Sequence, residues 1–86
     1  MYQIPRAVQG FMFRLEEADS ISRIKVLKPE TVAALKEHNI SIIEDLMDRE
    51  PTELEEIDGI SAEEQEKLQA VYLFLFRYVR KERHGQ

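Results

Sequence analysis

The sequence predicts an all-α fold of about five short helices, and three observations lead to this prediction. First, apolar residues recur at spacings of three and four through most of the chain, as in helices with one buried face. Second, two short turns each contain a residue suited to a left-handed backbone, and a serine that can cap the next helix follows. Third, no run alternates apolar and polar residues between turn residues, so no sheet is expected.

The N-terminal part of the chain predicts a longer helix followed by a short one. Pro5 suits a first helical position, and a helix is expected over about residues 6–18. Its buried stripe would consist of Ala7, Val8, Phe11, Met12 and Leu15, whereas Phe13 falls off that stripe. Ser20 offers a new cap, so a short helix over about residues 21–26 is expected next.

Two similar turns divide the middle of the chain, residues 20–70, into a tandem-turn unit. The turn residues are Asn39, Ile40, Gly59, Ile60 and Ser61. Asparagine and glycine tolerate a left-handed backbone, and the isoleucine after each can point back into a core. Ser41-x-x-Glu44 and Ser61-x-x-Glu64 are typical of capping boxes, in which serine and glutamate side chains bond free amides at a helix start.

Prolines and caps place the remaining helices. One helix is expected from Pro29 to the Asn39 turn, a second over about residues 42–49, and a third of one or two turns from Pro51. The last helix is expected over about residues 62–81.

The second half of this last helix, residues 70–76, is apolar on every side and must therefore be covered on every side. The tandem-turn unit can cover one face, and the N-terminal helix is expected to cover another. Any apolar surface left over would make the chain a homodimer through this helix, and otherwise it would be a monomer. Candidates for self-association are Tyr72, Phe74 and Phe76, although aromatic residues at helical spacing are more often core residues.

Length and composition restrict the range of functions. The 86 residues suffice for a single domain, residues 1–86, with an N-terminal helix (1–19), the tandem-turn unit (20–70), and a helix end with a basic tail (71–86). There is no cysteine, and His38 and His84 lie far apart, so neither a metal site nor a cofactor is predicted. No enzyme is predicted, because neither an ATPase motif nor a buried carboxylate pair is recognisable. A membrane span and a signal peptide are not recognisable either, so a cytoplasmic location is expected.

The net charge of −5 is unevenly distributed. Residues 29–66 hold thirteen acidic and two basic residues, whereas both ends are mildly basic. Such an acidic surface repels phosphate and can steer a basic protein partner, or it can simply remain solvated. The candidate partner-binding residues are Glu53, Glu55, Glu56, Asp58, Glu63 and Glu64. The candidate nucleic-acid contacts are Arg77, Arg80, Lys81 and Arg83, at a helix end where the dipole also favours positive charge.

The residues around the two turns resemble a helix-hairpin-helix domain. The resemblance rests on the segments LKEHNI (35–40), IEDL (43–46), EL (53–54) and IDGIS (57–61), and it covers about residues 20–70. Three branches are similar: the C-terminal domain of the bacterial RNA polymerase alpha subunit, the acidic repeat of the transcription factor NusA, and the N-terminal domain of RecA-like recombinases. The resemblance implies a helix-hairpin-helix core, to which this chain adds an N-terminal helix.

The resemblance also implies an activity, which in this family is usually sequence-independent binding of the DNA backbone by hairpin amides and a nearby cation. Such binding depends on positive charge, because phosphate contacts supply most of the non-specific affinity. This chain departs from the pattern at Ser61 (a second glycine in typical hairpins), at Ala62, Glu63 and Glu64 (basic residues in DNA-binding members) and at Glu30 (an arginine that touches DNA in the polymerase branch).

Two functions follow from these departures. We expect a non-catalytic acidic module that binds a protein partner in the transcription or DNA-maintenance machinery. The alternative is a sequence-independent DNA-binding module that uses the hairpin amides and the basic C-terminal end.

Overall fold

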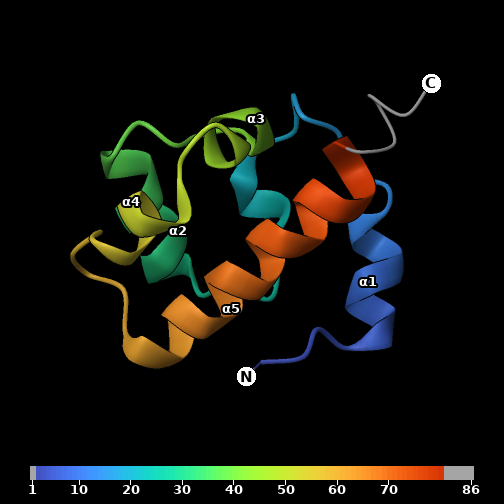
Figure 1. Cartoon of the computed structure of the whole chain (residues 1–86), viewed down its shortest axis with the longest axis horizontal. Coiled ribbons are helices and arrows are strands. Elements are labelled where there is room, and N and C mark those ends of the chain that lie inside the picture. Colours follow the sequence, from blue (N-terminus) through green and yellow to red (C-terminus); the bar gives the residue numbers. More distant parts are fainter. Residues whose placement is uncertain (1, 81–86) are drawn as a thin grey trace.

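The computed structural model describes residues 2–80, and it confirms the predicted all-α fold (Figure 1). Its elements are α1 (Arg6–Met12), the 3-10 turn η1 (Ile21–Arg23), α2 (Pro29–Glu37), α3 (Ile43–Met47), α4 (Pro51–Glu55), α5 (Ala62–Phe74) and the π-helix η2 (Leu75–Arg80). Within the described residues, extended pairing is limited to one isolated antiparallel bridge between Ser20 and Ile42.

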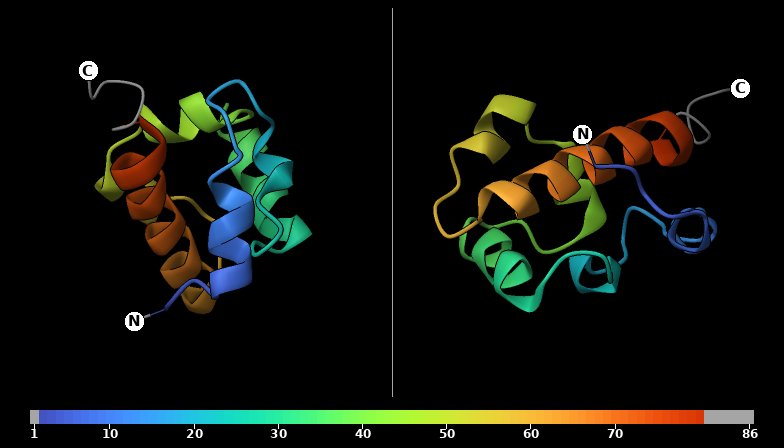
Figure 2. Two further views of the ribbon diagram at one scale, coloured as in Figure 1. Left: turned by 90° about the vertical axis from the view of Figure 1, so that its right-hand side faces the viewer. Right: turned by 90° about the horizontal axis from the view of Figure 1, so that it is seen from below.

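Helix α5 runs through the length of the molecule and the other helices pack around it. Helices α2, α3 and α4 lie on one side, and α1 lies on the other side, beside the C-terminal half of α5 (Figures 1 and 2). The core is formed by apolar side chains from every one of these helices, among them Met12, Leu35, Ile43, Leu54 and Leu68. None of the helices in residues 2–80 has the length and apolar character that a membrane crossing requires.

Helix α1 ends at Met12, six residues earlier than predicted, because the chain turns at that point to bury a different set of side chains. The backbone amide of Leu15 donates to the carbonyl of Met12 (3.1 Å), which makes a tight turn in place of a continuing helix. This turn buries both Met12 and Leu15. It also places the Phe13 ring edge-on against Phe74 and Tyr78, with centroids 5.1 and 5.4 Å apart.

Both predicted left-handed turns are present. Asn39 has φ of +66° and Gly59 has φ of +90°. Ile40 is fully buried, as the turn pattern predicts, whereas Ile60 is only partly buried against the core.

The capping box predicted at Ser41 and Glu44 is wrong by one position. Ile42 is the N-cap of α3, and the Asp45 carboxylate accepts from the backbone amides of Ser41 (3.1 Å) and Ile42 (3.3 Å). The reason is tertiary: the carbonyl of Ser41 accepts from the amide of Ile21, which keeps this segment extended beside η1.

The last helix is less shielded than predicted. Leu73, Phe76 and Tyr78 are 53%, 38% and 45% exposed, respectively, although Leu68, Val71, Leu75 and others of the same helix are buried. Helix α1 and the tandem-turn unit therefore leave part of the apolar surface of α5 and η2 open to solvent.

Candidate functional site

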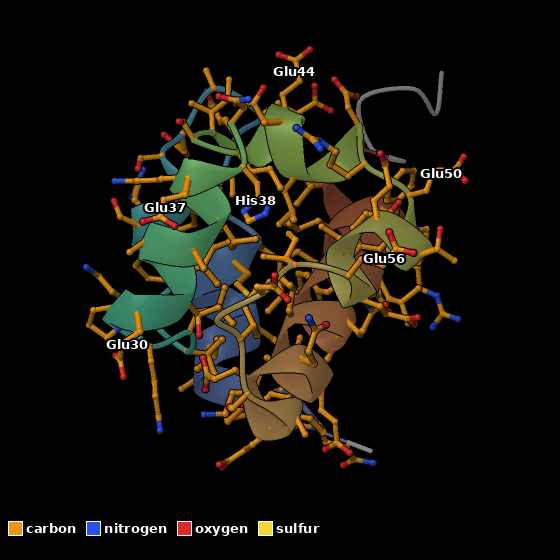
Figure 3. The ribbon with its side chains drawn as sticks, turned by 90° about the vertical axis from the view of Figure 1, so that its left-hand side faces the viewer. Glu30, Glu37, His38, Glu44, Glu50 and Glu56 are labelled. Atoms are coloured by element: carbon orange, nitrogen blue, oxygen red, sulfur yellow. The ribbon has the colours of Figure 1, made fainter. Side chains whose placement is uncertain are left out.

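The acidic residues predicted to bind a partner gather on α4 and on its connection to α5. Five of the six predicted residues are exposed: Glu53, Glu55, Glu56, Asp58 and Glu63. Further carboxylates continue this surface around α2 and α3, as Figure 3 shows for Glu30, Glu37, Glu44, Glu50 and Glu56. The structure thus brings together acidic side chains from four segments of the chain.

Helix α4 is held in place by contacts that leave its acidic side chains outward. The Gln65 amide on α5 donates to the carbonyl of Leu54 (2.9 Å), and the Tyr72 hydroxyl donates to the carbonyl of Arg49 (2.6 Å). Leu54 itself is fully buried between these contacts. Glu53 has a local role as well, because its carboxylate accepts from the Glu50 amide (2.8 Å) at the start of α4.

The sixth predicted residue, Glu64, does not belong to the acidic surface. It is 2% exposed, and its Oε1 accepts from the Lys28 amide (2.9 Å) and from the Thr31 hydroxyl (2.7 Å), while Oε2 lies 3.0 Å from Lys67 Nζ. Glu64 therefore joins α5 to the start of α2. The Ser61 hydroxyl still accepts from the Glu64 amide (3.2 Å), so only the serine half of the predicted capping box forms.

The surroundings of Glu64 keep it ionised. Burial opposes the charged form, but the donors from Lys28 and Thr31 and the ammonium of Lys67 outweigh that effect and hold the pKa of Glu64 below its ordinary value. The same contact raises the pKa of Lys67 above its ordinary value, chiefly through the hydrogen bond to Glu64. Both charges are therefore present at neutral pH.

The second turn is accounted for by packing. A Cβ atom at Gly59 would lie 3.7 Å from Cβ of Ala34, so the turn rests closely on α2, and its φ of +90° suits glycine. The first turn of α5 that follows carries Glu63 and Glu64. Carboxylates thus stand at the helix end where a phosphate would need positive charge.

The basic residues predicted to contact nucleic acid lie at the opposite end of the long helix. Arg77 is exposed on η2, whereas Lys81 and Arg83 and the Arg80 side chain lie outside the described residues. From Ser61 to Arg77 the helix extends roughly 20 Å, at about 1.5 Å per residue. Hairpin amides and Arg77 therefore cannot hold the same phosphate.

Two of the three residues predicted to mediate self-association are core residues. Tyr72 is 6% exposed and Phe74 is 7% exposed, and both pack inside the molecule. Phe76 is exposed at its outer edge, with its ring 5.0 Å from that of Tyr72.

Sequence reasoning missed Leu73, which lies between two hollows on the outer face of α5. One hollow, of about 500 Å³, is lined by Glu55, Gln65, Glu66, Gln69, Ala70 and Leu73. The other, of about 490 Å³, lies toward the N-terminal lead and also includes Ala70, Leu73 and Arg77. The signal was available as a spacing of four, three and four residues from Glu66 through Ala70 and Leu73 to Arg77.

The structure offers no metal chemistry in the part it describes. His38 Nδ1 lies 2.9 Å from the Ala34 carbonyl, one turn earlier on α2, and His84 is outside the described residues. Among residues 2–80, no three histidine, aspartate or glutamate side chains are grouped so that they could hold a metal ion.

Comparison with known proteins adds no assignment to this geometry. Neither a protein-family model, nor a curated protein, nor a solved structure matches the chain. The resemblance to helix-hairpin-helix domains therefore stays a prediction from the turn residues and their spacing.

Proposed function

We propose that the chain is a non-catalytic, acidic helix-hairpin-helix module that binds a basic protein partner of the transcription or DNA-maintenance machinery. The observation that carries the proposal is the group of exposed carboxylates around the α4–α5 connection, at Glu55, Glu56, Asp58 and Glu63. Dense charge of one sign raises the rate of encounter with a partner of opposite sign.

Charge at the hairpin favours a protein partner over DNA. Lys67, the basic residue of the second turn of α5, is engaged by the buried carboxylate of Glu64 (3.0 Å). Glu63 is exposed one residue away, and Glu30 is exposed at the start of α2. A DNA backbone approaching this end of α5 would meet carboxylates, whereas a lysine- or arginine-rich segment would be attracted.

The test is retention of a partner on immobilised protein from the native host's lysate, treated with nuclease. The first variant combines Glu55→Gln, Glu56→Gln, Asp58→Asn and Glu63→Gln. The matched control removes four other exposed charges, by Glu16→Gln, Glu30→Gln, Glu37→Gln and Glu44→Gln.

We expect the wild type and the control to retain the same protein, and the first variant to lose it. Glu53 is left unchanged, because its bond to the Glu50 amide starts α4. A partner that is released by nuclease, or that survives in the first variant, would contradict the proposal and favour the alternative of DNA binding.

A further inference from the structure

We propose that two copies of the chain pair in antiparallel orientation through a stripe on α5 and η2 formed by Glu66, Ala70, Leu73 and Arg77. Leu73 is 53% exposed at the centre of this stripe, an unusual position for a leucine in the middle of a helix that is otherwise largely covered. Contiguous apolar surface of this kind is characteristic of interaction sites.

The four residues share one face of the helix. Ala70 and Leu73 line both hollows of that face, Glu66 lines one of them, and Arg77 lines the other. Their spacing of four, three and four residues is that of a seam between two helices. The stripe is thus acidic at its N-terminal end, apolar in the middle and basic at its C-terminal end.

This order of charges is complementary to itself when the helices run in opposite directions. Glu66 and Arg77 lie at equal distances before and after the midpoint of Ala70 and Leu73. A two-fold axis at that midpoint places Glu66 of each copy opposite Arg77 of the other, and Ala70 of each opposite Leu73 of the other. Two ion pairs and two small-to-large contacts therefore form in one register.

Size and charge both favour a second copy as the occupant. Each Leu73 side chain would enter a hollow beside Ala70, where the small side chain leaves room for it. A uniformly basic partner would be repelled at Arg77, and a uniformly acidic partner would be repelled at Glu66. Because a single pair of helices buries less than a standard interface, the dimer is expected to be weak and to depend on concentration.

Sedimentation equilibrium of the full chain over a range of concentrations tests the pairing by exchange of charge. Glu66→Arg makes both ends of the stripe basic, and Arg77→Glu makes both ends acidic. We expect the mass of the wild type to rise from monomer toward dimer with concentration, and each single variant to stay monomeric.

An equimolar mixture of the two single variants decides the orientation. In the antiparallel pair every charge then meets its opposite, so the mixture is expected to dimerise as the wild type does, and so is the double variant Glu66→Arg/Arg77→Glu. Leu73→Glu should abolish dimers in every combination. Matched controls are Glu37→Arg and Lys25→Glu, which change exposed charges elsewhere and should leave dimerisation intact.

Three results would overturn the proposal: a wild type that remains monomeric at all concentrations, single variants that associate like the wild type, or a mixture that remains monomeric. Far-ultraviolet circular dichroism of each variant establishes that it is folded. Because all three substituted positions are exposed, the native helix content is expected throughout.

Discussion

Two residues of different kinds hold the two turns in the same backbone region. Asn39 and Gly59 have φ of +66° and +90°. A residue with a β-carbon loses roughly 1–2 kcal/mol in a left-handed conformation, and asparagine offsets part of that cost by local hydrogen bonding. Gly59 also has little surplus space, because its turn lies against Ala34.

The glycines allow the same substitution to be compared in two backbones. Gly59→Ala should lower the free energy of unfolding by about 1–2 kcal/mol, because of its positive φ. Gly10→Ala should raise it by about 0.5–1 kcal/mol, because Gly10 is helical and nothing lies within 4 Å of an added Cβ. Urea unfolding measures both, and equal effects of the two substitutions would show that Gly59 does not hold its turn.

Glu64 predicts a dependence of stability on pH. Its pKa in the folded chain is below the ordinary value of 4.5, so its contribution is complete above that pH and is lost as the pH falls through the folded pKa. At neutral pH, Glu64→Gln should lower the free energy of unfolding by about 1–3 kcal/mol, through the weakened bonds to Lys28, Thr31 and Lys67.

The pH series separates this charge from the shape of the side chain. The difference between wild type and Glu64→Gln is expected to be constant from pH 7 to about pH 4.5 and to shrink below it. Glu63→Gln, one residue away and exposed, is the control and should show little difference at either pH. A difference for Glu64→Gln that grows on acidification would refute the ionised, hydrogen-bonded state.

At the scale of elements, the short helices depend on their buried faces. Helix α1 has seven residues, and helices of that length are not stable alone in water. It is held by Met12, which is 1% exposed, and by the turn that follows it. Phe11, its neighbour, is 38% exposed and contacts the Arg23 guanidinium at 5.7 Å.

Adjacent substitutions in α1 should therefore differ strongly. Met12→Ala is expected to lower the free energy of unfolding by about 2–5 kcal/mol, as for a buried methionine that leaves a cavity. Phe11→Ala should lower it by about 0.5–1 kcal/mol, since its main contact is an exposed cation–π pair. Thermal unfolding compares them; similar effects would mean that α1 is not packed on the core through Met12.

At the scale of the whole molecule, charge separates the two ends of α5. Carboxylates surround its start and the described basic residue of the other end, Arg77, stands on η2. Such a distribution opposes binding of a polyanion along the helix, because few phosphates could be neutralised without others meeting carboxylates.

We accordingly expect no measurable binding of the full chain to duplex DNA at physiological salt, followed by fluorescence anisotropy. Lowering the salt should reveal at most weak binding, and Arg77→Glu should diminish it. Tight binding with a steep dependence on salt would instead assign the basic C-terminal end as a DNA-binding surface.

The sequence by itself determined the helical class, the two left-handed turns and the acidic belt, because these depend on signals that act within a few residues. Period, proline position and turn residues placed α2, α4 and the start of α5 close to where they lie. The exposed acidic residues of α4 could likewise be predicted, with the exception of Glu64.

Only the tertiary structure decided which residues of similar pattern are buried. Glu63 and Glu64 are neighbours of the same type, yet one is exposed and the other bonds a backbone amide 36 positions away, at Lys28. Leu73 and Phe74 are both apolar, yet Phe74 meets Phe13 where α1 ends early, and Leu73 meets solvent. Periodicity shows that a helix has faces, but the neighbours that cover each face come from distant parts of the chain, and no local signal specifies them.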